Sequence, residues 1–171
     1  MLRKPKFLIY VYSVLLVIIL AVIVITLIQI NDLDSLYAFH TANLNMSGFC
    51  GSGLPTVMLF YGNSCSSCGT ELSSFVNTTS LFGIWQGQRF YSSYFCAYSF
   101  NVSAYDSNQS SVFAPAQSPS IFNTLSDGKI PLLVFNGEYY KIGGFNTASA
   151  ADSSILEYIC KVINSSAPEC H

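Results

Sequence analysis

Charged residues are scarce in this sequence of 171 residues. Asp, Glu, Lys and Arg make up 9% of it, whereas an ordinary soluble domain carries about 25%. Basic residues are especially few after residue 30. Residues 31–171 contain four basic and nine acidic residues, so their net charge is −5. Nucleic-acid binding needs clustered Lys and Arg to meet the phosphates, so this composition argues against nucleic acid as a partner.

Histidine is also rare, and its two copies are poorly placed for chemistry. His40 lies in a predicted spacer and His171 is the last residue, so neither is expected to act as an acid or a base. We predict no metal site and no organic cofactor. Aromatic residues, in contrast, make up 15% of the chain. They are numerous enough to build a core, which argues against a disordered protein.

Residues 7–30 form a long run of 24 residues without a charge. At about 1.5 Å per residue, a helix of this length spans a hydrocarbon core of roughly 30 Å, so we predict a transmembrane helix here. Three basic residues precede the run and acidic residues follow it. The positive-inside rule therefore places the tail 1–6 in the cytoplasm and residues 31–171 outside the cell membrane. A cleaved signal peptide is the alternative, but its apolar region is only about 7–15 residues long.

Two further features indicate an oxidising compartment outside the cytoplasm. The chain has six cysteines, and disulfides persist where the milieu oxidises. It also has sequons of the N-x-S/T type, which are acceptors for N-glycosylation in secreted proteins. The candidate glycosylation sites are Asn45, Asn77, Asn101, Asn108 and Asn164.

The outer part is expected to consist of a spacer, residues 31–53, and one domain, residues 54–171. The spacer ends in a Gly/Ser-rich stretch that is too irregular for a helix or a strand. The domain begins with an apolar run at 56–61, typical of a strand buried on both faces. Further strands are predicted over 89–100, 132–135 and 138–142, and helices over 65–82, 120–126 and 148–163. Asn136-Gly137 is a strong hairpin signal, because both central residues of a type I′ turn need φ > 0.

The functional prediction centres on Cys65-Ser66-Ser67-Cys68, which lies between the first strand and the first helix of the domain. A spacing of three brings two sulfur atoms together across one helical turn, so that they can form a disulfide. The N-terminus of a helix carries unpaired N–H groups and a partial positive charge, which stabilise a thiolate. We predict Cys65 as the exposed nucleophile and Cys68 as the resolving thiol. The motif is also shared with zinc sites.

A second motif, Lys129-Ile130-Pro131-Leu132, begins the third predicted strand, a position where proline is tolerated. Together with the C-x-x-C motif, Asn136-Gly137, Gly143-Gly144 and a final helix, it resembles the thioredoxin superfamily over roughly residues 54–163. The resemblance implies a thioredoxin-like α/β fold, β-α-β-α-β-β-α, with a mixed four-stranded sheet of order 2-1-3-4. It also implies that the Ile130–Pro131 bond is cis, that Pro131 lies against the cysteine pair, and that the backbone of Ile130 binds an extended substrate.

Two residues near the motif have alternative interpretations. Glu71 lies one turn beyond Cys68, and an acid in the first turn of a helix interacts favourably with its dipole. This interpretation is favoured over a proton shuttle. Trp85, the only tryptophan, is interpreted as a packing residue rather than a substrate platform. The Ser66-Ser67 pair differs from the Gly-Pro of thioredoxins and the Pro-His of many disulfide-introducing enzymes, so the direction of electron flow stays open.

Four further cysteines, Cys50, Cys96, Cys160 and Cys170, are candidates for structural disulfides. Four thiols allow three pairings, and the sequence does not choose among them. A Cys160–Cys170 bridge is favoured because it would tie down the tail after the last helix. Cys50–Cys96 would then be the other bridge. One or two free buried thiols are the alternative.

The predicted function is that of a membrane-tethered enzyme, a thiol–disulfide oxidoreductase that acts on extracytoplasmic protein thiols and disulfides through mixed disulfides of Cys65 and Cys68. Its expected partners are these protein substrates, the membrane through residues 7–30, and an electron-transfer partner in the membrane, because a single redox pair must be recharged. Two alternatives stay open: a non-catalytic thioredoxin-like interaction domain with a structural disulfide, and a metal chaperone. The latter would need a further ligand near the pair, where no histidine lies.

Overall fold

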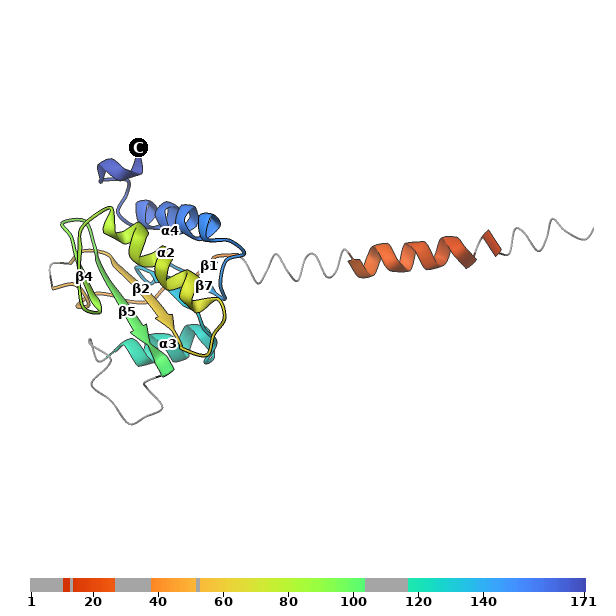
Figure 1. Cartoon of the computed structure of the whole chain (residues 1–171), viewed down its shortest axis with the longest axis horizontal. Coiled ribbons are helices and arrows are strands. Elements are labelled where there is room, and N and C mark those ends of the chain that lie inside the picture. The colour runs from red at the N-terminus through yellow and green to blue at the C-terminus, as the bar shows by residue number, and fades with distance from the viewer. Residues whose placement is uncertain (1–10, 13, 27–37, 52, 104–116) are drawn as a thin grey trace, which may run out of the picture. The chain divides into compact units, whose positions relative to one another are not determined.

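The computed structural model describes residues 11–12, 14–26, 38–51, 53–103 and 117–171. The chain divides into two compact units, Met1–Leu36 and Tyr37–His171. In the first unit, residues 11–12 and 14–26 are helical (red in Figure 1).

The predicted transmembrane helix over residues 7–30 is a point where structure and expectation differ. A span needs about 20 apolar residues in one helix, and no helix among the described residues is long and apolar enough to cross a membrane. The tail 1–6 and the remainder of the predicted span, residues 7–10, 13 and 27–30, lie outside the described residues.

The second unit contains one mixed sheet of seven strands in the order β1-β7-β6-β2-β5-β4-β3 (Figure 1). The strands are β1 (His40–Thr41), β2 (Thr56–Tyr61), β3 (Ile84–Gln86), β4 (Arg89–Tyr91), β5 (Cys96–Asn101), β6 (Leu132–Phe135) and β7 (Tyr139–Ile142). The predicted fold class, a four-stranded thioredoxin-like sheet of order 2-1-3-4 with a transmembrane helix, is therefore wrong. Three short strands extend the sheet: β1 pairs with β7 at one edge, and β4 and β3 follow β5 at the other.

Strand β2 lies in the middle of the sheet, parallel to β5 and antiparallel to β6. All its residues except Tyr61 are buried. Val57 and Leu59 belong to one hydrophobic core, and Met58 and Phe60 belong to another on the opposite face, as the two-residue period of a strand requires. The prediction of a strand buried on both faces over residues 56–61 is confirmed.

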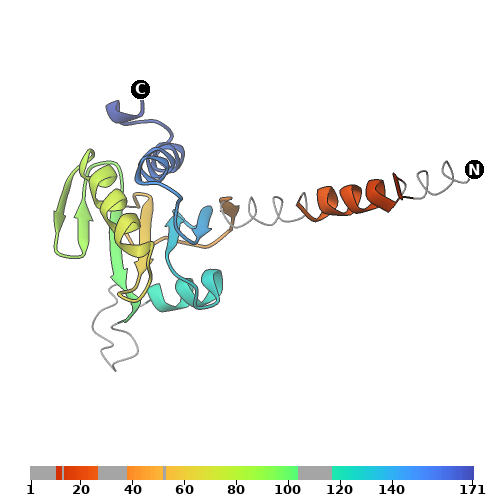
Figure 2. The same ribbon diagram turned by 45° about the vertical axis from the view of Figure 1, so that its right-hand side comes forward.

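Helices cover both faces of this sheet (Figure 2). They are α2 (Cys68–Ser80), α3 (Ser118–Ser126) and α4 (Ala148–Val162), and a 3-10 turn, η2 (Pro168–Cys170), follows α4. α2 and α4 pack together over the core that contains Leu59, and α3 packs over the core that contains Phe60. The apolar stripe predicted for the last helix points inward, because Ile155 and Ile159 are fully buried.

The predicted strand over residues 89–100 is two strands, β4 and β5, which run antiparallel to each other. The chain reverses at Ser92, whose Oγ accepts hydrogen bonds from the backbone N–H groups of Tyr94 and Phe95 at 3.0 and 3.2 Å. Neither glycine nor proline marks this turn, so composition does not reveal it. The error in the prediction comes from a serine that replaces the usual turn residues.

Part of the predicted spacer, residues 31–53, belongs to the folded unit. Phe49 is 4% exposed, and its carbonyl accepts a 2.7 Å hydrogen bond from the Tyr98 hydroxyl. Cys50 forms a disulfide with Cys96 at the start of β5. The spacer was predicted from its Gly/Ser content, but the covalent link and the buried phenylalanine hold this segment against the sheet.

The hairpin between β6 and β7 is confirmed. Asn136 and Gly137 have φ values of 52° and 70°, the positive values that a type I′ turn requires. The Glu138 N–H donates to the Phe135 carbonyl at 3.0 Å and closes the turn. The turn sets the register in which β7 returns along β6.

Candidate active site

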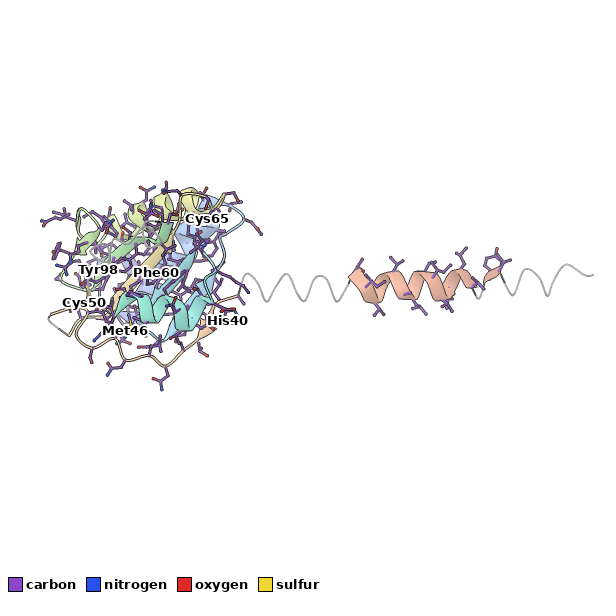
Figure 3. The ribbon with its side chains drawn as sticks, turned by 90° about the horizontal axis from the view of Figure 1, so that it is seen from below. His40, Met46, Cys50, Phe60, Cys65 and Tyr98 are labelled. Atoms are coloured by element: carbon purple, nitrogen blue, oxygen red, sulfur yellow. A yellow bond between two sulfur atoms is a disulfide. The ribbon has the colours of Figure 1, made fainter. Side chains whose placement is uncertain are left out.

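Strand β2 and helix α2 place the C-x-x-C motif at one end of the sheet. β2 ends at Tyr61, and a loop leads into α2, which begins at Cys68. Cys65 and Cys68 form a disulfide with Cα atoms 5.3 Å apart. Cys65 and Cys50 lie well apart in Figure 3, because Cys50 contacts Thr56 at the start of β2 whereas Cys65 follows its end.

The two sulfur atoms of this disulfide differ in exposure. Cys68 is 1% exposed, whereas Cys65 is partly exposed. The Ser67 hydroxyl lies 3.6 Å from Cys65 Sγ and can donate a hydrogen bond to it. Because a reacting sulfur must approach along the line of the S–S bond, the exposed Cys65 is the accessible end of the pair.

The Ile130–Pro131 peptide bond is cis, as predicted, and lies beside the cysteine pair. The Ile130 carbonyl oxygen is 3.9 Å from Cys65 Sγ. Gly62, just after β2, packs so closely against Ile130 that a side chain at Gly62 would overlap Ile130 Cδ1. The end of β2 and the start of β6 thus meet around Cys65.

A polar network borders the pair on the β5 side. The Asn63 backbone N–H donates to Ser103 Oγ at 2.9 Å, and the Asn101 side-chain amide donates to Asn63 Oδ1 at 2.8 Å. Asn101 Oδ1 in turn accepts from the Ser103 N–H at 3.0 Å. These bonds fix the loop that leads to Cys65.

The loop of residues 143–145, which follows β7, packs against the start of α2. Gly143 N–H donates to the Pro131 carbonyl at 2.8 Å. A methyl group at Gly144 would lie 2.8 Å from Ser67 Oγ, so only glycine allows this close approach. The loop therefore connects the start of β6 to the residue that precedes Cys68.

Glu71, in the first turn of α2, is buried beneath this loop with 1% exposure. Its Oε2 accepts a hydrogen bond of 3.3 Å from the Phe145 N–H, and its Oε1 has no hydrogen-bond partner among the described residues. Burial raises the pKa of Glu71 to about 7, although the Phe145 N–H and the charge of Lys141 both lower it. The favoured interpretation of Glu71 as an ordinary first-turn acid does not account for this burial.

Lys141 on β7 is the second buried charged residue of the described chain, at 0% exposure. Its Nζ donates to the carbonyls of Gly143 and Gly144 at 2.7 and 3.2 Å and lies 4.5 Å from the centre of the Phe145 ring. Burial lowers the pKa of Lys141, while the charge of Glu71 raises it. Lys141 is not among the residues predicted from the sequence. The only sequence feature that could have indicated it is its position just before the Gly143-Gly144 pair.

The four remaining cysteines form the bridges Cys50–Cys96 and Cys160–Cys170, with Cα atoms 5.9 and 5.7 Å apart. The favoured pairing is confirmed. No cysteine is free, so the alternative with free thiols is wrong. The first bridge attaches the segment before β2 to β5, and the second attaches η2 to α4.

The structure also places most of the other residues singled out in the sequence. Trp85 packs between Phe75 and Phe90, and its Nε1–H donates to Thr79 Oγ1 at 2.9 Å, so its prediction as a packing residue is confirmed. His40 is exposed in β1 and His171 is exposed at the end of the chain. Of the sequon asparagines, Asn45, Asn77 and Asn164 are exposed, Asn101 is partly buried, and Asn108 lies outside the described residues.

The site combines an accessible sulfur, a buried partner sulfur, a backbone carbonyl and a buried carboxyl group at one end of the sheet. These groups can exchange a disulfide with another thiol and hold a proton close by. Across the described ranges, no three His, Cys, Asp or Glu side chains are grouped so that they could hold a metal ion. In comparisons with known proteins, no family model and no curated protein matches this chain.

Proposed function

We propose that this protein is a thiol–disulfide oxidoreductase that acts on protein thiols and disulfides through Cys65 and Cys68. The observation that carries the proposal is an accessible sulfur, Cys65 Sγ, that belongs to a disulfide and lies 3.9 Å from the backbone carbonyl oxygen of Ile130. This disulfide joins residues only three apart. Cross-linking so short a loop removes little entropy from the unfolded chain, so a purely structural role explains it poorly.

The proposed reaction follows from the different exposure of Cys65 and Cys68. In the disulfide form, a substrate thiolate attacks Cys65 Sγ and Cys68 leaves. In the reduced form, the Cys65 thiolate attacks a substrate disulfide, and Cys68 then attacks Cys65 and releases the substrate. The N–H groups at the start of α2 stabilise the thiolate.

The motif order supports a relation to the thioredoxin superfamily in the site, although the seven-stranded sheet departs from the four-stranded fold that we expected. The two other disulfides support the proposal that the protein acts in an oxidising compartment outside the cytoplasm. A separate redox protein would recharge the pair, because no cysteine remains unpaired to do so.

Trapping of mixed disulfides tests this function. Cys68→Ser leaves Cys65 without its resolving partner, so it should accumulate mixed disulfides with glutathione and with protein substrates. Cys65→Ser should accumulate none. A double variant, Cys160→Ser with Cys170→Ser, is the matched control and should exchange thiols like the unmodified protein.

A pair that resists glutathione would contradict the proposal. A reduction potential below about −300 mV, which is typical of structural bridges, would point to the non-catalytic interaction domain.

A further inference from the structure

The Cys160–Cys170 disulfide lies at the surface of the domain, where a dissolved molecule can reach it. Both cysteines are partly exposed, and both line a cavity of about 490 Å³ between the end of α4 and η2. Leu156, Lys161 and His171 line the same cavity. A cavity of this size accepts a small organic molecule. A small thiol such as glutathione can therefore approach the bridge while the domain is folded.

The Cys50–Cys96 bridge is less accessible. Cys50 is 6% exposed, and its Sγ lies 3.1 Å from the Thr56 hydroxyl in a buried contact. This bridge closes a sequence separation of 46, against 10 for Cys160–Cys170. Cross-linking the shorter loop removes less entropy from the unfolded chain, so it stabilises the bridged form less. Burial and loop length both make Cys160–Cys170 the easier of the two bridges to open.

The Cys160–Cys170 bridge ties the C-terminal tail, residues 166–171, to α4. The backbone hydrogen bonds that this tail donates in the structure are local and end on residues 163–168. Ala167 is fully buried, but a single methyl group contributes little burial. η2 lies beyond the end of α4, at the outside of the domain (Figure 2). Opening the bridge should therefore free the tail while the rest of the domain stays folded.

The turn between α4 and the tail contains a strained residue. Asn164 and Ser165 have φ values of 52° and 51°, in the left-handed region where asparagine is tolerated and serine is uncommon. Asn164 ends α4 in a common way, in which the Ser165 N–H donates to the Cys160 carbonyl at 2.8 Å. The conformation of Ser165 is costly and persists only where the surroundings hold it. The bridge spans this turn, so opening it allows Ser165 to relax.

We propose that Cys160–Cys170 is a second site of thiol–disulfide exchange, which small thiols such as glutathione open in the folded protein, and that its reduction releases the tail. This inference goes beyond the proposed function, because it involves neither Cys65 nor Cys68. The bridge makes the end of the chain respond to the ratio of thiols to disulfides around the protein.

The exchange proceeds in two steps. A thiolate attacks one sulfur atom of the bridge, the S–S bond breaks, and the other cysteine leaves as a thiolate that takes up a proton. A second thiolate then attacks the external sulfur of the mixed disulfide and frees the first cysteine, which also takes up a proton. Two small thiols are thereby oxidised to one disulfide, and their two electrons reduce the bridge.

The urea dependence of reduction tests whether the bridge opens in the folded protein. The oxidised protein is incubated with reduced glutathione, and mass spectrometry of its peptides identifies cysteines that have become thiols or glutathione adducts. A bridge that opens only by global unfolding reacts about fivefold faster, or more, for each added molar of urea. We expect this dependence for Cys50–Cys96. The rate for Cys160–Cys170 should change by less than about twofold at about 1 M urea, because only a local opening is needed.

Amide hydrogen exchange tests the release of the tail. Reduction of the bridge should speed exchange in residues 166–171 and leave β2 protected. The double variant Cys160→Ser with Cys170→Ser should show the same fast exchange in the tail without any reductant. Cys50→Ser with Cys96→Ser is the matched control, and its tail should exchange as slowly as that of the unmodified protein.

Two results would overturn the inference. One is a Cys160–Cys170 bridge that glutathione leaves intact in the folded protein, or that opens with the same urea dependence as Cys50–Cys96. The other is a tail whose exchange stays slow after the bridge is reduced. Neither result bears on the proposed function, which is judged by mixed disulfides at Cys65.

Discussion

Glu71 on α2 and Lys141 on β7 interact electrostatically in the interior of the domain, although 70 residues separate them in the sequence. Burial raises the pKa of the first and lowers the pKa of the second, so it favours the neutral form of each, while their attraction opposes both shifts. Both contact the loop of residues 143–145. The protonation states of Glu71 and Lys141 are therefore linked to the loop that packs against Ser67.

The stability of the domain should fall as pH rises toward neutrality. The pKa of Glu71 is about 7 in the folded state against an ordinary value of 4.5, so the folded state binds this proton more tightly. The free energy of unfolding should therefore decrease between about pH 4.5 and pH 7, by up to about 3 kcal/mol from this group. Urea unfolding of the unmodified protein and of Glu71→Gln should show a clear decrease in the former and a smaller one in the latter. Equal decreases would contradict the assignment.

Gly144→Ala should loosen the loop over the site. The added methyl group would overlap Ser67, and overpacking of this kind costs about 1–3 kcal/mol. We expect a lower unfolding midpoint and altered exchange at Cys65. Gly69→Ala is the control on the same helix, because a side chain there meets open space. It should stabilise the protein by up to about 1 kcal/mol, since alanine favours the helix.

Removal of the Cys50–Cys96 bridge should cost more stability than removal of Cys160–Cys170. The first closes a loop with a sequence separation of 46 and the second one of 10. Chain entropy assigns about 4 kcal/mol to the longer loop and about 2.7 kcal/mol to the shorter. Double Cys→Ala variants compared by urea unfolding would test this, and a larger loss for the shorter loop would show that native contacts outweigh loop entropy.

Thr79→Val should destabilise the packing of Trp85. The variant removes the acceptor of the indole N–H, in a partly buried hydrogen bond, and the donor to the Phe75 carbonyl, in a buried one. A buried donor left without a partner costs about 1–3 kcal/mol. Thr70→Val is the control, because Thr70 is exposed on the same helix, and its effect should stay within about 0.5 kcal/mol. Tryptophan fluorescence during unfolding gives the readout, and equal effects would contradict a role for this hydrogen bond.

The centre of the sheet could be predicted from local sequence, and its edges could not. Residues 56–61 and 132–135 are short apolar runs bounded by turn residues, and β2 and β6 occupy these bounds. β1 has two residues and β3 and β4 have three each, too few to show a period in the sequence. Their positions depend on pairing with strands already in place, and that information is not local.

The candidate site was predictable to the extent that its residues are adjacent in sequence or follow a known motif order. Cys65, Cys68 and the cis bond before Pro131 belong to that group. The electrostatic surroundings of Glu71 depend on Lys141 and Phe145, which come from distant parts of the chain. An acid on the first turn of a helix is usually exposed, so no pattern of nearby residues separates this case from the common one.

The Cys50–Cys96 bridge also determines how the domain would respond to a mechanical load at its N-terminal end. Tension on residues before 40 would act first on Phe39, whose ring contacts Phe135 and Tyr158, and on β1, which pairs with β7 over two residues. Unravelling would then stop at Cys50, because the covalent bond passes the load to β5, the direct neighbour of β2. The disulfide thus acts as a mechanical stop that keeps the Cys65–Cys68 end of the sheet intact under tension.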